Sequence, residues 1–534
     1  MVTSLLPREK IIIIGAGAAG LAAATALRGS ASVLVLDAQT RLGGRVHTDH
    51  SLGVPVELGA AWIHRAEGNI VSELAHSFGC TTAVSENKRL VVYRQSGEQV
   101  GTATLTRVYQ LLSRSIMPEI LRRRSTMRAD GRDDVSLGTL ASSLPSLSDI
   151  HGVKRCVLDF LLFRDIVQDH TADLWQTSAA RYDTDHYGGA GKDHVLPGGF
   201  DCVIDGMKRS SGLRVRAPAH LAEQDRGLWD LGRHNTHAGI RLGEAGEVTR
   251  LRWSDAGVEA TLANGVVEIA DRVIVTVPLG VLKASIARDH ASGSTRADGS
   301  SQDGHARVLS FEPSLPSHVL MAIGRLGYGE ALKVALRFPA VFWPREAHFL
   351  GKVGGECHSL GSAQRHMEFL NVAKFTDEPV LLMETETGHA RELATMSDPQ
   401  IVQVVVDELR RMFGADQVPS PVGAVVARLG NNSFQRGGFT FMPPGCTHEL
   451  HRILATPLAN GRLIMAGEHT SSLHAGTVHG AIVSGRRAAA HARAAMRGRD
   501  VLAGGEEYEE AYKAELFRSI YDEDREEETW DRNP

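Results

Sequence analysis

The sequence has little cysteine, no basic excess and no long apolar run, and each of these absences excludes a class of protein. Its five cysteines are scattered and form no C-x-x-C pair, which favours free thiols in a reducing compartment and gives no metal site. The formal net charge of −5 offers no general attraction for nucleic acid. No apolar run is long enough to cross a bilayer, and the first predicted strand leaves no room for a cleaved signal ahead of it. We therefore expect a cytoplasmic protein without nucleic-acid or membrane partners.

The strongest motif is a glycine-rich turn that follows a short apolar strand near the N-terminus. Residues 11–14 are all isoleucine, as in a strand buried on both faces, and Gly15, Gly17 and Gly20 then form G-x-G-x-x-G. The first glycine permits a tight turn, the second lets the backbone approach a pyrophosphate, and the third lets the helix pack closely on the strand. Asp37 follows at about the 20-residue spacing that suits a ribose hydroxyl pair. The motif predicts a dinucleotide site, with NAD and FAD both possible.

Two later stretches extend this pattern. LDAQTRLGGRV ends in a glycine loop in which Arg45 can pair with a phosphate, and ELGAAWIH carries Gly59 and Ala60 ahead of Trp62 and His64. Together with GAGAAGLAAATAL, these stretches resemble the flavin-containing amine oxidase family, which includes polyamine oxidases, monoamine oxidases and flavin-dependent histone demethylases. The resemblance implies FAD as the cofactor.

The resemblance also implies an α/β fold of mixed α+β character. In it, a Rossmann-like FAD-binding domain is interleaved with a substrate-binding domain of mixed sheet and helices. The polar stretch 214–240 and the Ser-, Gly- and Asp-rich stretch 289–306 do not fit the family pattern, and we expect surface insertions there. The expected parts are the FAD-binding segments 1–86, 195–287 and 428–500, the substrate-domain segments 87–194 (helical) and 308–427, a disordered insertion at 288–307, and a solvated or partly helical acidic tail at 501–534.

The resemblance assigns further contacts to the cofactor. Glu468 is similar to the acid that holds the ribityl–phosphate region, and the backbone at 477–478 is expected at the pyrimidine end of the flavin, at the positive end of a helix. Val248 is expected to meet the adenine, and Pro278 to lie near the flavin. The expected cofactor-binding residues are Gly15, Ala16, Gly17, Gly20, Asp37, Gly44, Arg45, Gly59, Ala60, Trp62, Val248, Pro278, Glu468, Thr477 and Val478.

Lys333 illustrates how the resemblance changes an interpretation. In the alternating segment LGYGEALKVALRF its position predicts a solvent-facing lysine, but the segment resembles the one that carries the family's active-site lysine. The implied role of Lys333 is to hold a water against flavin N5 and assist reoxidation by O₂. His64 is implied to hydrogen-bond a substrate nitrogen. The substrate is expected to contact Trp62, His64, Phe439 and Thr477.

Three details favour one branch of the family. Gly437 and Gly438 are followed by Phe439 where monoamine oxidases attach FAD through a cysteine, so we expect non-covalent FAD. Thr477 stands where those enzymes place a tyrosine, and the chain has neither the added N-terminal helical domain nor the helical hairpin of the histone demethylases. We therefore expect a polyamine oxidase that acts on spermine, spermidine or their N-acetylated forms, by hydride transfer to flavin N5 with O₂ as acceptor, and yields H₂O₂, an aldehyde and a shorter amine.

Two alternatives stay open. The chain could be another flavin amine oxidase, of the monoamine or histone-lysine demethylase type, or a catalytically silent FAD-binding scaffold. The second alternative is motivated by Leu429 and Asn432, which occupy places where the family often has Trp and Asp.

Overall fold

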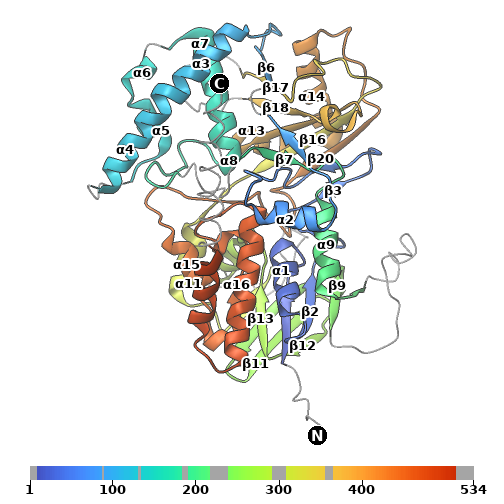
Figure 1. Ribbon diagram of the computed structural model, residues 1–534, viewed down its shortest axis with the longest axis vertical. Helices are drawn as coiled ribbons and strands as arrows, with labels where there is room; N and C mark the ends of the chain where they lie inside the picture. Colours follow the sequence, from blue (N-terminus) through green and yellow to red (C-terminus); the bar gives the residue numbers. More distant parts are fainter. Residues whose placement is uncertain are drawn as a thin grey trace, which may run out of the picture.

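The structure of the protein is a computed structural model that describes residues 9–86, 89–129, 134–148, 150–182, 191–216, 238–291, 308–354 and 365–512. Figure 1 shows two parts stacked along the long axis of the molecule, one built on a parallel sheet and the other on a second, mixed sheet. The chain passes between them several times, which agrees with the mixed α/β fold predicted from the sequence.

The first part is organised around six parallel strands in the order β22-β13-β1-β2-β9-β8. Alternate residues of the central strand β1 enter two different apolar clusters, one on each face of the sheet. This explains why the four consecutive isoleucines show no polar alternation. The strands are β1 (Lys10–Ile14), β2 (Ser32–Asp37), β8 (Val215–Arg216), β9 (Gly239–Leu242), β13 (Arg272–Val275) and β22 (Leu463–Met465).

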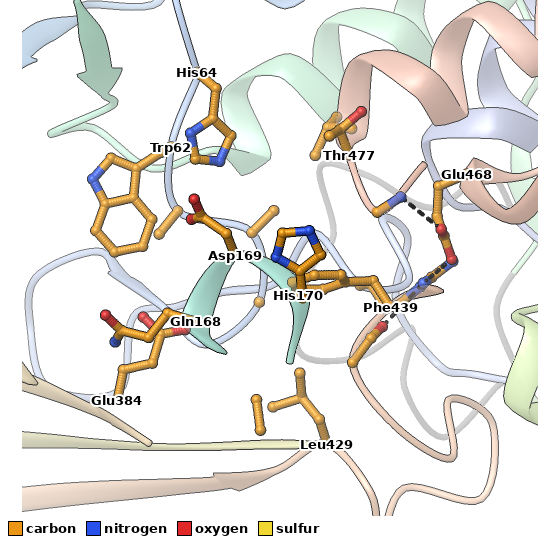
Figure 2. Close-up of a pocket in the computed structure, with 18 of the residues that line it drawn as sticks. Trp62, His64, Gln168, Asp169, His170, Glu384, Leu429, Phe439, Glu468 and Thr477 are labelled. Atoms are coloured by element: carbon orange, nitrogen blue, oxygen red, sulfur yellow. Dashed lines mark hydrogen bonds and ion pairs between the residues drawn. The ribbon is translucent and has the colours of Figure 1, made fainter. Parts of the chain in front are cut away.

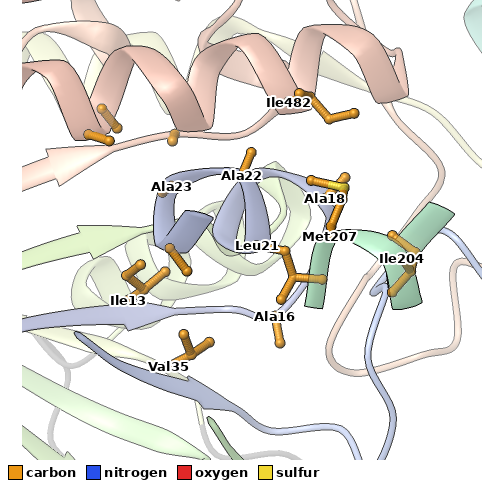
Figure 3. Packing of buried hydrophobic residues seen from close by; sticks show 14 of the residues in the cluster. Ile13, Ala16, Ala18, Leu21, Ala22, Ala23, Val35, Ile204, Met207 and Ile482 are labelled. Carbon is orange, nitrogen blue, oxygen red and sulfur yellow. The ribbon is translucent and has the colours of Figure 1, made fainter. Parts of the chain in front are cut away.

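Small residues bring two long helices together over this sheet. Figure 3 shows the helix α1 (Ala18–Leu27) between the strands and α16 (Val478–Met496), with Ala22 below Ile482. A Cβ atom on Gly485 of α16 would lie 2.1 Å from the carbonyl oxygen of Ala19. The alanines of α1 and the glycine of α16 therefore permit a close helix contact that larger side chains would prevent. The same side of the sheet also carries α2 (Ile70–Ser77) and α9 (Asp201–Ser211).

A smaller four-stranded sheet, in the order β12-β11-β10-β14, covers the other face of the parallel sheet. Asn264 and Gly265 form the turn between β11 and β12, as the Asn-Gly pair predicts, and Gly265 has a φ of +83°. The elements are β10 (Val248–Ser254), β11 (Gly257–Leu262), β12 (Val267–Ala270), β14 (Ser310–Glu312), α10 (Leu279–Ala291), α11 (Ser317–Arg325) and α15 (Glu449–Ala455).

The second part contains a six-stranded sheet in the order β20-β16-β19-β18-β17-β6, in which only the β17–β6 pair is parallel. The helix α14 (Asp398–Phe413) packs on this sheet and begins and ends at the residues that its sequence pattern predicts. The strands are β6 (Leu90–Tyr93), β16 (Ala331–Arg337), β17 (Phe349–Lys352), β18 (Met367–Asn371), β19 (Val380–Glu386) and β20 (Gly423–Arg428).

A helical layer lies beside the second sheet and supplies one wall of the site described below. The prediction that segment 87–194 is helical agrees with two long runs in this layer. Residues 102–129 form a continuous run of α-, π- and α-helix, and residues 152–167 begin as α-helix and end as a π-helical turn. The helical elements are α3 (Thr102–Leu111), η1 (Leu112–Ile116), α4 (Met117–Ala129), α5 (Leu137–Ser142), α7 (Gly152–Leu162), η2 (Phe163–Val167) and α8 (Gln168–His170).

The prediction that all five cysteines are free thiols is wrong. Cys80 and Cys202 form a disulfide although 122 positions separate them in the sequence, because α2 and α9 pack side by side. Cys156 and Cys446 are free, and Cys357 lies outside the described residues. The argument from free thiols to a reducing compartment therefore no longer holds. Among the described residues, no helix combines the length and the apolar character needed to cross a membrane.

The structure adds detail to three of the predicted segments. The stretch 214–240 contains β8 and the first two residues of β9, so both of its ends belong to the parallel sheet, and α10 extends into the stretch 289–306. The acidic tail begins with a helix over residues 501–512. Its Tyr508 and Tyr512 pack against the apolar cluster that contains residues of α1 and α16. Residues 217–237, 292–307 and 513–534 lie outside the described residues.

Candidate active site

A cavity of about 1630 Å³ lies between the two parts and brings the predicted site residues together. Ala16 and Gly20 do not line it, since their predicted roles belong to the turn and helix beneath it. The predicted residues on its wall are Gly15, Gly17, Asp37, Gly44, Arg45, Gly59, Ala60, Trp62, His64, Val248, Pro278, Lys333, Phe439, Glu468, Thr477 and Val478. A cavity of this size exceeds the usual range of small-molecule pockets and has room for a dinucleotide and a second ligand.

The glycines at one end of the cavity fit the roles that their spacing predicts. A Cβ atom on Gly20 would lie 1.9 Å from the carbonyl oxygen of Gly15, so the helix can pack this closely on the turn only without a side chain there. By contrast, a Cβ atom on Gly17 would meet no protein atom nearer than 3.6 Å. The space above Gly17 belongs to the cavity, and a phosphate can approach the backbone there.

Asp37 shapes the same end of the cavity from the end of β2. Its carboxylate accepts hydrogen bonds from the backbone N–H groups of Ala16 (2.6 Å) and Gln39 (2.7 Å). Burial raises the pKa of Asp37, and these two hydrogen bonds partly oppose that shift. The side chain therefore stabilises the glycine turn, and its remaining lone pairs can accept from a ribose hydroxyl.

Arg45 and Glu468 form an ion pair across 423 positions of sequence. One guanidinium nitrogen of Arg45 lies 2.7 Å from Glu468 Oε1 and 3.0 Å from the carbonyl oxygen of Gly438. Glu468 also accepts from the Thr440 hydroxyl and the Gly476 N–H. Burial alone would raise the pKa of Glu468. The charges of Arg45 and His469, with the hydrogen bonds from Arg45 and Gly476, together outweigh burial, and the pKa lies below its usual value. Glu468 is thus held as a carboxylate beside the cavity.

Thr477 is the N-cap of α16, so the start of this long helix faces the cavity. The Thr477 hydroxyl donates to the His474 carbonyl (2.8 Å) and accepts from the Gly480 N–H (3.0 Å). The backbone of Thr477 and Val478 thereby presents the positive end of the helix dipole at the cavity wall, where it favours a ligand with negative charge.

Lys333 is buried, which overturns the solvent-facing position that its alternation pattern predicts. The side chain is 4% exposed because β16 is buried on both faces. Its ammonium donates to the Gly59 carbonyl (2.8 Å), lies 3.0 Å from Glu384 Oε1 and 5.6 Å from the centre of the Trp62 ring. Glu384 also lines the cavity and was not predicted as a site residue.

His64 and Trp62 lie on the side of the pocket opposite Phe439 and Thr477 (Figure 2). His64 Nδ1 lies 3.2 Å from the carboxylate of Asp193, which β7 (Asp193–Val195) brings alongside. Burial alone would raise the pKa of Asp193, but the hydrogen bond and the charge of His64 lower it. Asp193 therefore orients the imidazole at the cavity wall.

Several charged side chains of this wall were missed by the sequence reasoning. Arg164 forms a buried ion pair with Glu368, and the turn that follows carries Asp165 and Asp169 into the cavity lining. The sequence did offer one signal of acidic side chains at this wall. Glu384 and Glu386 lie at alternate positions of β19, which is otherwise largely apolar. Tyr182 also lines the cavity, and residues 183–190 lie outside the described residues.

Leu429 and Asn432 depart from the family pattern, and only the first of them lines the cavity. Leu429 contributes an apolar side chain to the cavity wall, where Figure 2 shows it beneath Phe439. Asn432 does not line the cavity, and its side chain accepts from the Phe434 N–H (2.9 Å) in a local turn. Only Leu429 therefore changes the chemistry of the wall directly.

A glycine-lined cradle with a buried ion pair, continuous with a charged pocket around a buried lysine, defines a dinucleotide-dependent enzyme site. Residues 18–493 match the family described as flavin containing amine oxidoreductase, and the chain belongs to that family. It is 30% identical to polyamine oxidase 4 of Oryza sativa subsp. japonica, over 90% of this chain and 88% of that protein. It is 28% identical to lysine-specific histone demethylase 1 homolog 3 of Arabidopsis thaliana, over 94% of this chain and 31% of that protein.

Proposed function

We propose that this protein is a polyamine oxidase with non-covalently bound FAD. The observation that carries the proposal is the excess of acidic side chains on the cavity wall beside Lys333, where four carboxyl groups stand against two cations, Lys333 and Arg164. A polycation is attracted by such a wall, whereas a small monoamine uses little of it. The four residues are Asp165, Asp169, Glu368 and Glu384.

The residues of the cradle fit FAD. Gly17 leaves room for a pyrophosphate, Asp37 can accept from the ribose, and the N-terminus of α16 suits the electron-rich end of a flavin. When bound, FAD supplies the hydride acceptor and the route to O₂ that amine oxidation requires. Neither of the two described free cysteines, Cys156 and Cys446, lines the cavity, which supports a non-covalent cofactor.

The other residues of the site orient the amine and keep it dry. Trp62 and Phe439 lie on opposite sides of the pocket (Figure 2) and offer apolar surface that favours the neutral form of an amine held between them. His64, oriented by Asp193, is placed to hydrogen-bond a second nitrogen of the substrate. Lys333 is placed to hold a water at the cavity wall beside Gly59. The products are an aldehyde, a shorter amine and H₂O₂.

A peroxide assay tests the proposal. Purified protein is supplied with spermine, spermidine, their N-acetylated forms, a simple monoamine and a methylated histone peptide. We expect peroxide with at least one polyamine, and a kcat/KM for it at least about 10-fold above that for the monoamine. Peroxide from the peptide alone would favour the demethylase alternative, and no peroxide with bound FAD would favour a silent scaffold.

The cofactor is tested separately. We expect the purified protein to be yellow and to release its FAD into the supernatant when it is precipitated with acid. Flavin that remains with the precipitate would contradict the non-covalent assignment without affecting the proposed substrate.

A further inference from the structure

One carboxylate from the neighbouring strand holds the ammonium of Lys333. β16 and β19 pair antiparallel with Lys333 directly opposite Glu384, and directly opposed residues of a sheet place their side chains side by side. Glu384 and the Gly59 carbonyl accept two of the three N–H bonds of the ammonium. Among the described residues, Glu384 and the Gly59 carbonyl are the polar partners of the ammonium. Because they fix two of its N–H bonds, the direction of the third N–H bond is fixed as well.

The surroundings of Glu384 leave it available to Lys333. On the other edge of β19, the strand β18 places Glu368 directly opposite Glu384, and the charge of Glu368 is paired with Arg164. Glu386 lies two positions further along β19, and burial, followed by the charge of Glu384, raises its pKa well above the usual value. Burial therefore favours the neutral form of Glu386, which weakens its competition for the ammonium.

One more carboxyl group acts on Lys333 from another element. Glu57, on the short strand β4 (Val56–Glu57), interacts with the charge of Lys333, but burial raises the pKa of Glu57 to about 7. It also accepts from the Phe200 N–H (2.7 Å) and the Thr48 hydroxyl (2.9 Å). Glu384 is thus the carboxylate in direct contact with Lys333.

We propose that Glu384 is a positioning residue, which aims the ammonium of Lys333 into the cavity. The proposal rests on the role that the proposed function gives to Lys333. A lysine side chain that is 4% exposed has lost most of the hydration of its charge, and a carboxylate 3.0 Å away replaces that hydration. Without Glu384, the ammonium would keep only the Gly59 carbonyl as a partner and would lose its direction.

The test uses reoxidation of the flavin in the purified holoprotein, without any amine substrate. The flavin is reduced by light, mixed with O₂-containing buffer and followed by its absorbance in parent, Lys333→Met, Glu384→Gln and the double variant. We expect reoxidation to slow about 100-fold in Lys333→Met and about 10-fold in Glu384→Gln. The double variant should be no slower than Lys333→Met alone, because Glu384 acts only through Lys333.

Two further variants separate positioning from a general structural role. Glu384→Asp keeps a carboxylate opposite Lys333 and should recover most of the loss. The matched control is Glu378→Gln, which removes the carboxylate paired with Arg337, another cation of β16, outside the cavity. Its rate should equal that of the parent.

A second measurement does not depend on the flavin reaction. Lys333→Met leaves Glu384 without its cation and should lower the thermal unfolding midpoint, whereas Lys333→Met/Glu384→Leu should recover part of that loss. An unchanged rate in Glu384→Gln, or an equal slowing by this substitution with and without Lys333, would overturn the proposal. An unchanged rate in Lys333→Met would overturn it too. Because no amine is added, a failure of the proposed polyamine activity leaves this test unaffected.

Discussion

Two of the ion pairs on the cavity wall differ in which partner faces the ligand. In the Arg45–Glu468 pair the carboxylate is 4% exposed and the guanidinium 22%, whereas in the Lys333–Glu384 pair the ammonium is 4% exposed and the carboxylate 19%. All four residues line the cavity. The cradle therefore presents a cation where an anionic pyrophosphate is expected, and the pocket presents an anion where a cationic amine is expected.

This difference shows that burial, and not ion pairing alone, decides what a charged pair does. The buried member of each pair is held by several protein groups: Glu468 by Thr440 and Gly476 in addition to Arg45, and Lys333 by Gly59 in addition to Glu384. The more exposed member keeps surface for a ligand of opposite charge. Four predictions test this comparison, two for the cradle and two for the pocket.

The largest effect is expected from Glu468→Leu, which removes the buried anion of the cradle. Arg45 would then lack its counter-charge, and the hydrogen bonds from Thr440 and Gly476 would be lost. We expect the free energy of unfolding to fall by about 3–5 kcal/mol and the purified protein to lose FAD. Denaturant unfolding and the flavin absorbance check this, with Glu449→Gln on the exposed face of α15 as the control. Stability within about 0.5 kcal/mol of the parent would show that Arg45 needs no buried partner.

The next effect separates two glycines of the cradle. Gly20→Ala places a Cβ atom 1.9 Å from a backbone oxygen, so we expect a loss of about 1–3 kcal/mol in unfolding free energy. Gly17→Ala should change stability by less than about 0.5 kcal/mol but weaken FAD binding at least about 10-fold, because its methyl group enters the cavity. Denaturant unfolding measures the two stabilities, and FAD titration of the apoproteins measures the two affinities. Equal FAD affinities for parent and Gly17→Ala would mean that the phosphate lies elsewhere.

A pH effect of similar size is expected from Glu57, beside the pocket. Burial raises its pKa to about 7, above the value of the unfolded chain, so folding favours the protonated form. The stability that this shift contributes is complete below about pH 4.5 and is lost as the pH rises through about 7, a change of about 3 kcal/mol. Glu57→Gln mimics the protonated group and should remove this decline. Thermal unfolding across this pH range would show parallel curves for parent and variant if Glu57 is instead ionised throughout.

The smallest effect is expected from His64→Ala. It removes one hydrogen bond to the substrate and should raise KM for polyamines about 10-fold, with little effect on short monoamines. Asp193→Asn should give part of this effect, because Asp193 orients the imidazole without meeting the substrate. Steady-state peroxide kinetics measure both variants. An equal rise in KM for monoamines and polyamines would assign His64 to a structural role.

The features that could be predicted from the sequence are those that depend on neighbouring residues. The strand, glycine turn and helix at 10–27 follow from isoleucine burial, positive φ and alanine propensity, and the structure confirms each. The hairpin at 264–265 and the helix at 398–413 follow from equally local signals. The resemblance to a family added distant residues such as Glu468, which no local pattern could connect with Arg45.

The features that could not be predicted depend on which segments the fold brings together. Lys333 looked solvent-facing because alternation shows one apolar face and says nothing about what covers the other. The disulfide between Cys80 and Cys202 depends on the packing of α2 against α9, and the docking of 501–512 depends on apolar tyrosine faces within an acidic stretch.

By itself, the sequence determined a dinucleotide cradle, because glycine spacing and strand burial act through the local backbone and need no distant partner. Only the tertiary structure decided the chemistry of the pocket. The register of β16 against β19 places Glu384 opposite Lys333, and burial gives that pair its effect, since a charge removed from water depends on the few groups that surround it.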